Sequence, residues 1–65
     1  MEKVVFTIPS LYADHHVTRV RETLLGLNGA QEVAVSSAFK TAAVVFDHSR
    51  LTVQEMMEAL EEAGY

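Results

Sequence analysis

Polar and apolar residues alternate over residues 2–8, near the start of the chain. Val4, Phe6 and Ile8 fall on one face of this segment, and the residues between them fall on the other. A period of two in residues that favour β-structure predicts a strand. Pro9 should end it, because proline cannot donate to the hydrogen-bond ladder of a sheet.

Apolar residues spaced three or four apart predict a helix over residues 15–27. The apolar face of this helix consists of Val17, Val20, Leu24 and Leu27. Asn28 and Gly29 are expected to end it, because glycine readily adopts the left-handed conformation that closes many helices.

A second helix is expected to start near Val53. It follows the sequence Thr52-x-x-Glu55, which is typical of a capping box, and Leu51 and Met56 are placed to pack together as a hydrophobic staple. Its buried stripe is expected to comprise Val53, Met56, Met57, Leu60 and Ala63. The glycine directly after this stripe should close the helix.

Two further strands, residues 32–37 and 41–47, lie between the helices and are joined by a loop of hairpin length. The order strand, helix, strand, strand, helix is that of a ferredoxin-like α+β domain, in which two helices cover one face of an antiparallel sheet. The last strand of that pattern is missing from residues 1–65, which form one domain. The strand over residues 2–8 should then be a free sheet edge, and we expect it to support a homodimer by edge pairing or strand exchange.

Composition excludes several functional classes. Five Lys and Arg against nine Asp and Glu give a net charge of −4, which argues against nucleic acid as a partner. No apolar segment approaches the roughly 20 residues of a membrane span, and the N-terminus lacks the apolar core of a signal peptide. We therefore expect no membrane insertion and a cytoplasmic location. No nucleophile, base and orienting group occur together, so we do not expect an enzyme.

Two segments carry a resemblance to a known family. They are HVTRVRETLLGLNGAQEVAVS, residues 16–36, and AAVVFDHSRLTVQEMMEALEEAGY, residues 42–65. In their order and spacing they resemble the heavy-metal-associated domain. This module occurs in copper chaperones, in mercury-binding periplasmic proteins and in the N-terminal regions of metal-transporting P-type ATPases. The resemblance implies the ferredoxin-like fold, a role in metal transport, and docking on partners through the first helix and the metal loop.

The sequence departs from this family where the family binds metal. The family signature is Met-x-Cys-x-x-Cys, and Leu11, Ala13 and His16 occupy the methionine, first-cysteine and second-cysteine positions. The chain contains no cysteine at all. Soft Cu(I) is held in the family by two thiolates at a helix N-terminus, and Ala13 supplies no ligand in their place. We therefore expect no family-type Cu(I) site.

Other ligand types occupy the same loop, LYADHH, residues 11–16. Asp14, His15 and His16 offer one carboxylate and two imidazoles, a set that suits zinc foremost, or nickel, cobalt or copper(II). Against this, successive helical residues point about 100° apart, so both histidines can face one ion only if one of them lies in the loop. The alternative is that Asp14 caps the first helix and both histidines are solvated.

The two helices differ in charge, and this difference suggests a second functional class. Arg19 and Arg21 lie beside the histidines on the first helix, whereas the second helix is acidic. This pattern fits docking on a metal-transporting ATPase or another protein through the first helix, with or without a metal ion. Tyr65 matches a family position whose ring lies close to the metal loop. His48 is expected to be a turn residue and not a ligand.

Overall fold

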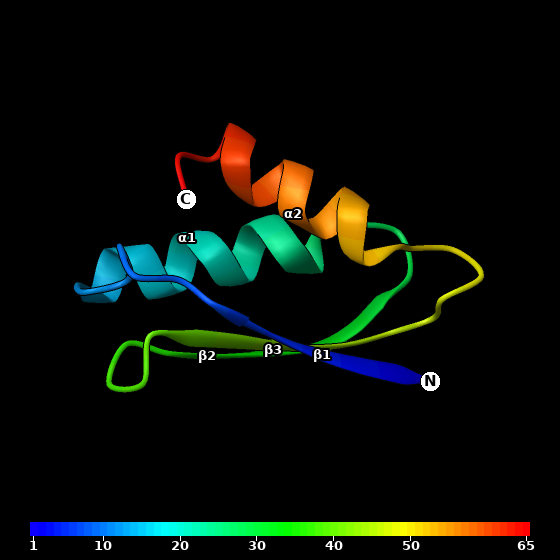
Figure 1. Cartoon of the computed structure of the whole chain (residues 1–65), viewed down its shortest axis with the longest axis horizontal. Coiled ribbons are helices and arrows are strands. Elements are labelled where there is room, and N and C mark those ends of the chain that lie inside the picture. The colour runs from blue at the N-terminus through cyan, green and yellow to red at the C-terminus, as the bar shows by residue number, and fades with distance from the viewer.

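The computed structural model describes all residues, 1–65, and contains two helices packed on one face of a three-stranded sheet (Figure 1). The elements are β1 (Glu2–Thr7), α1 (Asp14–Leu25), β2 (Ala30–Ser36), β3 (Thr41–Phe46) and α2 (Val53–Glu62). The strand order is β1-β3-β2, and both pairs are antiparallel. The predicted ferredoxin-like βαββα fold is confirmed. Neither helix is long and apolar enough to cross a membrane.

Strand register places the apolar rows toward the helices. Val44 in the central strand lies opposite Val4 on one side and Val33 on the other. Because side chains alternate along a strand, the rows two residues away on either side of this set share its face. The buried core consists of Ile8, Leu11, Val20, Leu24, Ala42, Val44, Phe46, Leu51, Met56 and Leu60.

Helix α1 ends earlier than the sequence predicts. Its last residue is Leu25, and Gly26 is the C-cap in an ordinary right-handed conformation. The expectation that Asn28 and Gly29 end this helix is therefore wrong. Leu27 lies beyond the helix but still packs against the core, which explains why its spacing matched the helical pattern. Glycine has a low helix propensity, so the helix stops at the first glycine it meets.

Helix α2 begins as predicted. The Glu55 amide donates to the Thr52 hydroxyl oxygen and the Thr52 amide donates to the Glu55 carboxylate, each at 3.2 Å, which completes the capping box. The staple residues Leu51 and Met56 are both buried. The predicted buried stripe is too wide, because Val53 is 38% exposed and Met57 is 48% exposed. Met57 lies beside β1, the last strand on that side of the sheet, so no strand covers it.

Gly29 lies in the connection between α1 and β2. This connection and the one before α2 lie at the end of the molecule opposite the start of α1 (Figure 1). The Gly29 φ of 105° lies in the region that favours glycine, and the Gly29 carbonyl accepts a hydrogen bond of 2.9 Å from the Asp47 amide. A Cβ at this position would lie 2.9 Å from the Arg50 Cβ and 3.0 Å from the Leu51 Cβ. The backbone at Gly29 therefore approaches the connection before α2 too closely for any side chain.

Asp47 organises that connection by accepting hydrogen bonds from Ser49. The Ser49 hydroxyl and amide donate to its Oδ1 at 2.7 and 3.1 Å, and they hold the pKa of Asp47 below its usual value of 3.8. A carboxylate whose pKa is lower in the folded state stabilises the fold at pH values above its unfolded-state pKa. This contribution is lost as the pH falls through the folded-state pKa.

We expect Ser49→Ala to lower the melting temperature at neutral pH, because it removes the hydroxyl hydrogen bond that contributes most to the lowered pKa of Asp47. The difference from the parent should disappear in strong acid, where Asp47 is protonated in both chains. Thermal melts by circular dichroism across the acid range measure it. Ser37→Ala is the matched control, because the Ser37 side chain makes no hydrogen bond in the structure. A difference that persists unchanged into strong acid would contradict this prediction.

Candidate metal centre

The loop between β1 and α1 is anchored to the core by Ile8 and Leu11. Ile8 and Leu11 are buried, at 3% and 0% exposure, and the Leu11 amide donates to the Ile8 carbonyl at 3.0 Å. Leu11 holds the position where the family signature has methionine. The loop that leads into the helix start with Asp14 and the two histidines is therefore fixed by packing.

Ala13, not Asp14, is the N-cap of α1. Its backbone is extended, with φ −136° and ψ 155°, and no side chain caps the helix. Its carbonyl accepts hydrogen bonds from the His16 and Val17 amides at 3.0 and 3.3 Å. The alternative in which Asp14 caps the helix is therefore wrong. Asp14 is the first helical residue, where a negative charge interacts favourably with the helix dipole.

The two imidazole rings lie side by side at this helix start. Their centroids are 4.2 Å apart, with 35° between the ring planes. His15 is exposed and His16 is half-buried, so the expectation that both are solvated holds only for His15. Both residues are helical, and neither lies in the loop. Although successive helical residues point about 100° apart, the rings of His15 and His16 lie side by side.

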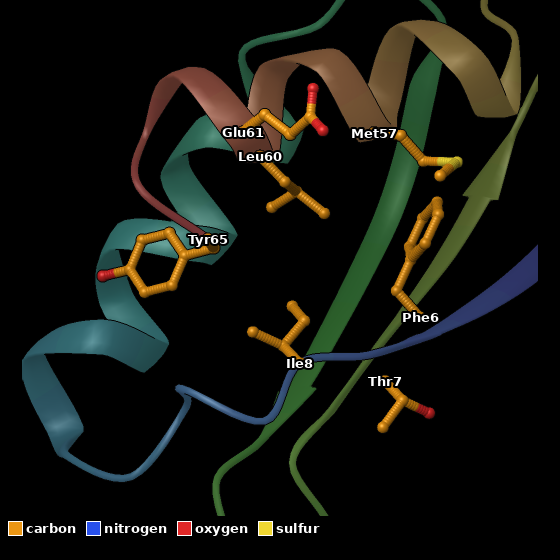
Figure 2. A pocket seen from close by; sticks show the side chains of 7 residues that line it. All are labelled: Phe6, Thr7, Ile8, Met57, Leu60, Glu61 and Tyr65. Carbon is orange, nitrogen blue, oxygen red and sulfur yellow. The ribbon is translucent and has the colours of Figure 1, made fainter.

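Tyr65 reaches the helix start from the far end of the chain. The Tyr65 amide donates to the Leu60 carbonyl at 2.8 Å and the Gly64 amide donates to the Glu61 carbonyl at 3.0 Å. With Gly64 at a φ of 93°, these bonds form a Schellman motif at the end of α2. This motif directs the tyrosine ring toward α1, as Figure 2 shows.

His16 and Tyr65 are joined by a short hydrogen bond. The distance from His16 Nδ1 to the Tyr65 hydroxyl oxygen is 2.7 Å, and the two rings meet edge to face with centroids 5.4 Å apart. A histidine that binds metal through one ring nitrogen usually donates the other N–H to an acceptor. The hydroxyl oxygen can serve as that acceptor, which leaves Nε2 as the nitrogen available to a metal ion.

The structure gathers only part of the ligand set proposed from the sequence. No group of three or more His, Cys, Asp and Glu side chains is arranged to hold a metal ion. The two imidazoles are together, whereas the Asp14 carboxylate makes no hydrogen bond or ion pair. His48 lies in the connection before α2, at the opposite end of the molecule (Figure 1), in agreement with its prediction as a turn residue.

Tyr12 also lies beside His16, which the sequence analysis did not predict. Its ring centroid lies 4.9 Å from that of His16, and its side chain is 70% exposed. Tyr12 precedes the extended N-cap Ala13 and lies outside α1, so helical spacing does not predict this contact. We refer to Tyr12, His15, His16 and Tyr65 as the imidazole cluster.

Comparisons with known proteins place this chain in a family. A model of the heavy-metal-associated domain matches residues 5–65. The copper chaperone CopZ of Staphylococcus haemolyticus is 31% identical over 61 residues, which cover 94% of this chain and 90% of that protein. The structure of oxidized MerP from Ralstonia metallidurans CH34 superposes with a TM-score of 0.95 at 25% identity, covering 98% of this chain and 89% of that one. A copper binding domain from HMA7, a P-type ATPase, gives 0.94 at 25% identity, with 98% and 86% covered.

The fold is thus that of a ferredoxin-like α+β domain with an imidazole cluster at the start of its first helix. The chain belongs to the heavy-metal-associated domain family. It is a member without the two cysteines of the family signature, because it contains no cysteine.

Proposed function

We propose that this domain binds a divalent metal ion, zinc foremost, at the start of α1, with His16 Nε2 as the principal ligand. The observation that carries the proposal is the hydrogen bond of 2.7 Å between His16 Nδ1 and the Tyr65 hydroxyl. It orients the imidazole and leaves Nε2 free, as is typical of zinc-binding histidines. Membership of a heavy-metal-associated family supports metal as the ligand class.

His15 and Asp14 are the further ligands in this proposal. The His15 ring already lies beside His16, and rotation about its side-chain bonds changes the direction of its nitrogens without moving the helix. Asp14 precedes both and is exposed, so its carboxylate is free to turn. Three protein ligands leave one position of a tetrahedral zinc shell to water or to a second copy. Nickel, cobalt and copper(II) accept the same nitrogen and oxygen donors.

Metal titration of His16→Ala tests the proposal. We expect the parent to bind Zn(II) and the variant to lose at least about tenfold in affinity, which corresponds to about 1.4 kcal/mol. Isothermal titration calorimetry with Zn(II), Ni(II) and Cu(II) at neutral pH measures this loss. His48→Ala is the matched control, because it removes an exposed imidazole at the opposite end of the molecule. Equal affinity in the parent and His16→Ala would refute the proposal, and so would a parent that binds no metal.

The Tyr65 hydroxyl should also matter for affinity. Tyr65→Phe keeps the ring but removes the hydroxyl that forms a hydrogen bond with His16 Nδ1, and loss of such a partner typically weakens metal binding by roughly 10-fold or more. Tyr12→Phe removes a hydroxyl from the same cluster, but that hydroxyl makes no hydrogen bond in the structure. We expect Zn(II) affinity to fall in the first variant only. Equal effects of the two variants would show that the hydroxyl does not orient His16.

A protein-interaction or regulatory module without metal is the second candidate function. The absence of a preformed group of three ligands favours it, as do Arg19 and Arg21, which are both exposed on α1 beside the cluster. The proposed partner is a metal-transporting ATPase or another protein with an acidic docking surface, reached in the cytoplasm through α1. In this case Arg19→Glu weakens partner binding, whereas His16→Ala leaves it unchanged.

A further inference from the structure

The face of the sheet opposite the helices is partly apolar. Both helices lie on the other face (Figure 1). Side chains of the central strand β3 alternate between half-buried and buried positions, so the half-buried Thr41, Ala43 and Val45 point away from the helices. An antiparallel sheet with one solvated face usually carries polar residues on that face. Ala43 and Val45 depart from this rule, as does Val5, which pairs with Ala43 and is 56% exposed.

Strand register arranges the side chains of this face in three rows that cross β1, β3 and β2. The first row is charged at its two ends, because Lys3 in β1 and Glu32 in β2 both pair with Val45. The other two rows are uniform, one of apolar and one of hydroxyl side chains. They consist of Val5, Ala43 and Ala34, and of Thr7, Thr41 and Ser36. We refer to the three rows as the open face.

A two-fold axis parallel to the strands makes the open face complementary to itself. An axis of this direction, placed between two copies at β3, exchanges the positions of β1 and β2 and keeps the position along the strands. Lys3 of one copy then faces Glu32 of the second copy, and the reverse pair forms as well. The apolar row meets the apolar row, and the hydroxyl row meets the hydroxyl row. Each position therefore meets a side chain of matching chemistry.

A two-fold axis perpendicular to the strands does not give this match. It places each strand over its own copy in the reverse direction, so the charged row meets the hydroxyl row. Lys3 would then face Thr7, and Glu32 would face Ser36. Both charges would lack a partner of opposite sign. Charge complementarity therefore selects the axis parallel to the strands.

We propose that the open face binds a second copy of this chain about this axis, with the helices of both copies on the outside. Lys3 and Glu32 have long side chains that together span the roughly 10 Å between two sheets packed face to face. The match uses only side chains of β1, β3 and β2, so it holds whatever lies beside the edge of β1. It also holds whether or not the imidazole cluster binds a metal ion.

The proposed dimer places both imidazole clusters at the same end. The start of α1 lies at the end of the molecule where the hairpin joins β2 and β3 (Figure 1). The axis keeps the position along the strands, so this end coincides in the two copies. The two clusters lie on opposite outer layers and stay accessible. A dimer thus presents two candidate metal centres in one direction, and a partner with two docking sites can engage both of them.

The size of the open face predicts a weak dimer. Three rows of three side chains are fewer than the roughly 20–30 residues that each partner contributes to a standard interface. We expect a dissociation constant of about 0.1–1 mM. Sedimentation equilibrium at concentrations up to about 1 mM measures it.

Reversing the charges at the ends of the charged row tests the proposal. Lys3→Glu and Glu32→Lys each bring like charges together, so each should raise the dissociation constant at least about threefold. Lys3→Glu/Glu32→Lys exchanges the two charges and should return it to within about twofold of the parent. Arg21→Glu and Glu22→Lys are the matched controls, because they make the same charge changes at exposed positions of α1. They should change it less than about twofold.

NMR of a mixture of 13C-labelled and unlabelled domain locates the contact. We expect intermolecular NOEs at the methyl groups of Ala43 and Val45, which lie closest to the axis. NOEs confined to the helices or to the edge of β1 would overturn the proposal, and so would a parent that stays monomeric up to the highest concentration. A double variant that dimerises no better than either single variant would also overturn it. Equal effects of the reversals in the open face and in α1 would count against it in the same way.

Discussion

Gly29→Ala is expected to destabilise the domain by about 3 kcal/mol, the sum of a strained backbone and a steric collision. The φ of 105° at this residue is unfavourable for any side chain. The added methyl group would also lie 2.9 Å from the Arg50 Cβ and 3.0 Å from the Leu51 Cβ. Leu51 is buried in the core and directly precedes Thr52, the N-cap of α2. It therefore cannot move away without disturbing the core packing and the helix cap.

Gly64→Ala separates strain from collision. Gly64 also has a positive φ, of 93°, but a Cβ there would meet nothing within 4 Å. We expect it to cost about 1 kcal/mol, from strain alone. Urea unfolding of the parent and both variants gives the two free energies of unfolding. If Gly29→Ala costs no more than Gly64→Ala, the contact between Gly29 and the connection before α2 is looser than the distances indicate.

The periodic parts of the chain could be predicted from the sequence, because each is decided by local spacing. The alternation in residues 2–8 and the capping box at Thr52 both correspond to elements of the structure. The end of α1 could not be placed in this way. Leu27 continues the helical spacing, but it lies beyond the helix and packs against the core from there. The exposure of Met57 also depends on the sheet, since it follows from the absence of a strand beyond β1.

The candidate site was only partly predictable, because its geometry depends on residues far apart in the sequence. His16 was identified from its position in the family signature, but its hydrogen bond joins residues 49 positions apart. The placement of the Tyr65 ring requires the Schellman motif at Gly64. The contact of Tyr12 with His16 depends on the conformation of the loop before α1, which helical spacing does not predict.

Replacing Ala13 and His16 by cysteine is expected to create a Cu(I) site in this domain. The His16 amide donates to the Ala13 carbonyl at 3.0 Å, so the two positions are one turn apart at the start of α1 and their side chains share a face. A thiol at a helix N-terminus loses its proton more readily, because the helix dipole favours the thiolate. Two thiolates are the soft ligands that Cu(I) prefers.

The parent has no thiolate, so it should release Cu(I) to a chromogenic chelator, whereas Ala13→Cys/His16→Cys should retain one equivalent. We expect affinity to rise at least roughly a thousandfold, which is about 4 kcal/mol. Ala13→Ser/His16→Ser is the matched control, since it places side chains of similar size without sulfur at the same positions. Zn(II) titration of this control should show the loss expected for His16→Ala, because the imidazole is gone in both. Cu(I) retention by the parent would mean that its nitrogen donors suffice. Failure of the cysteine pair to exceed the serine pair would mean that the packing of Leu11 and the backbone of Ala13 do not hold positions 13 and 16 for two-thiolate coordination.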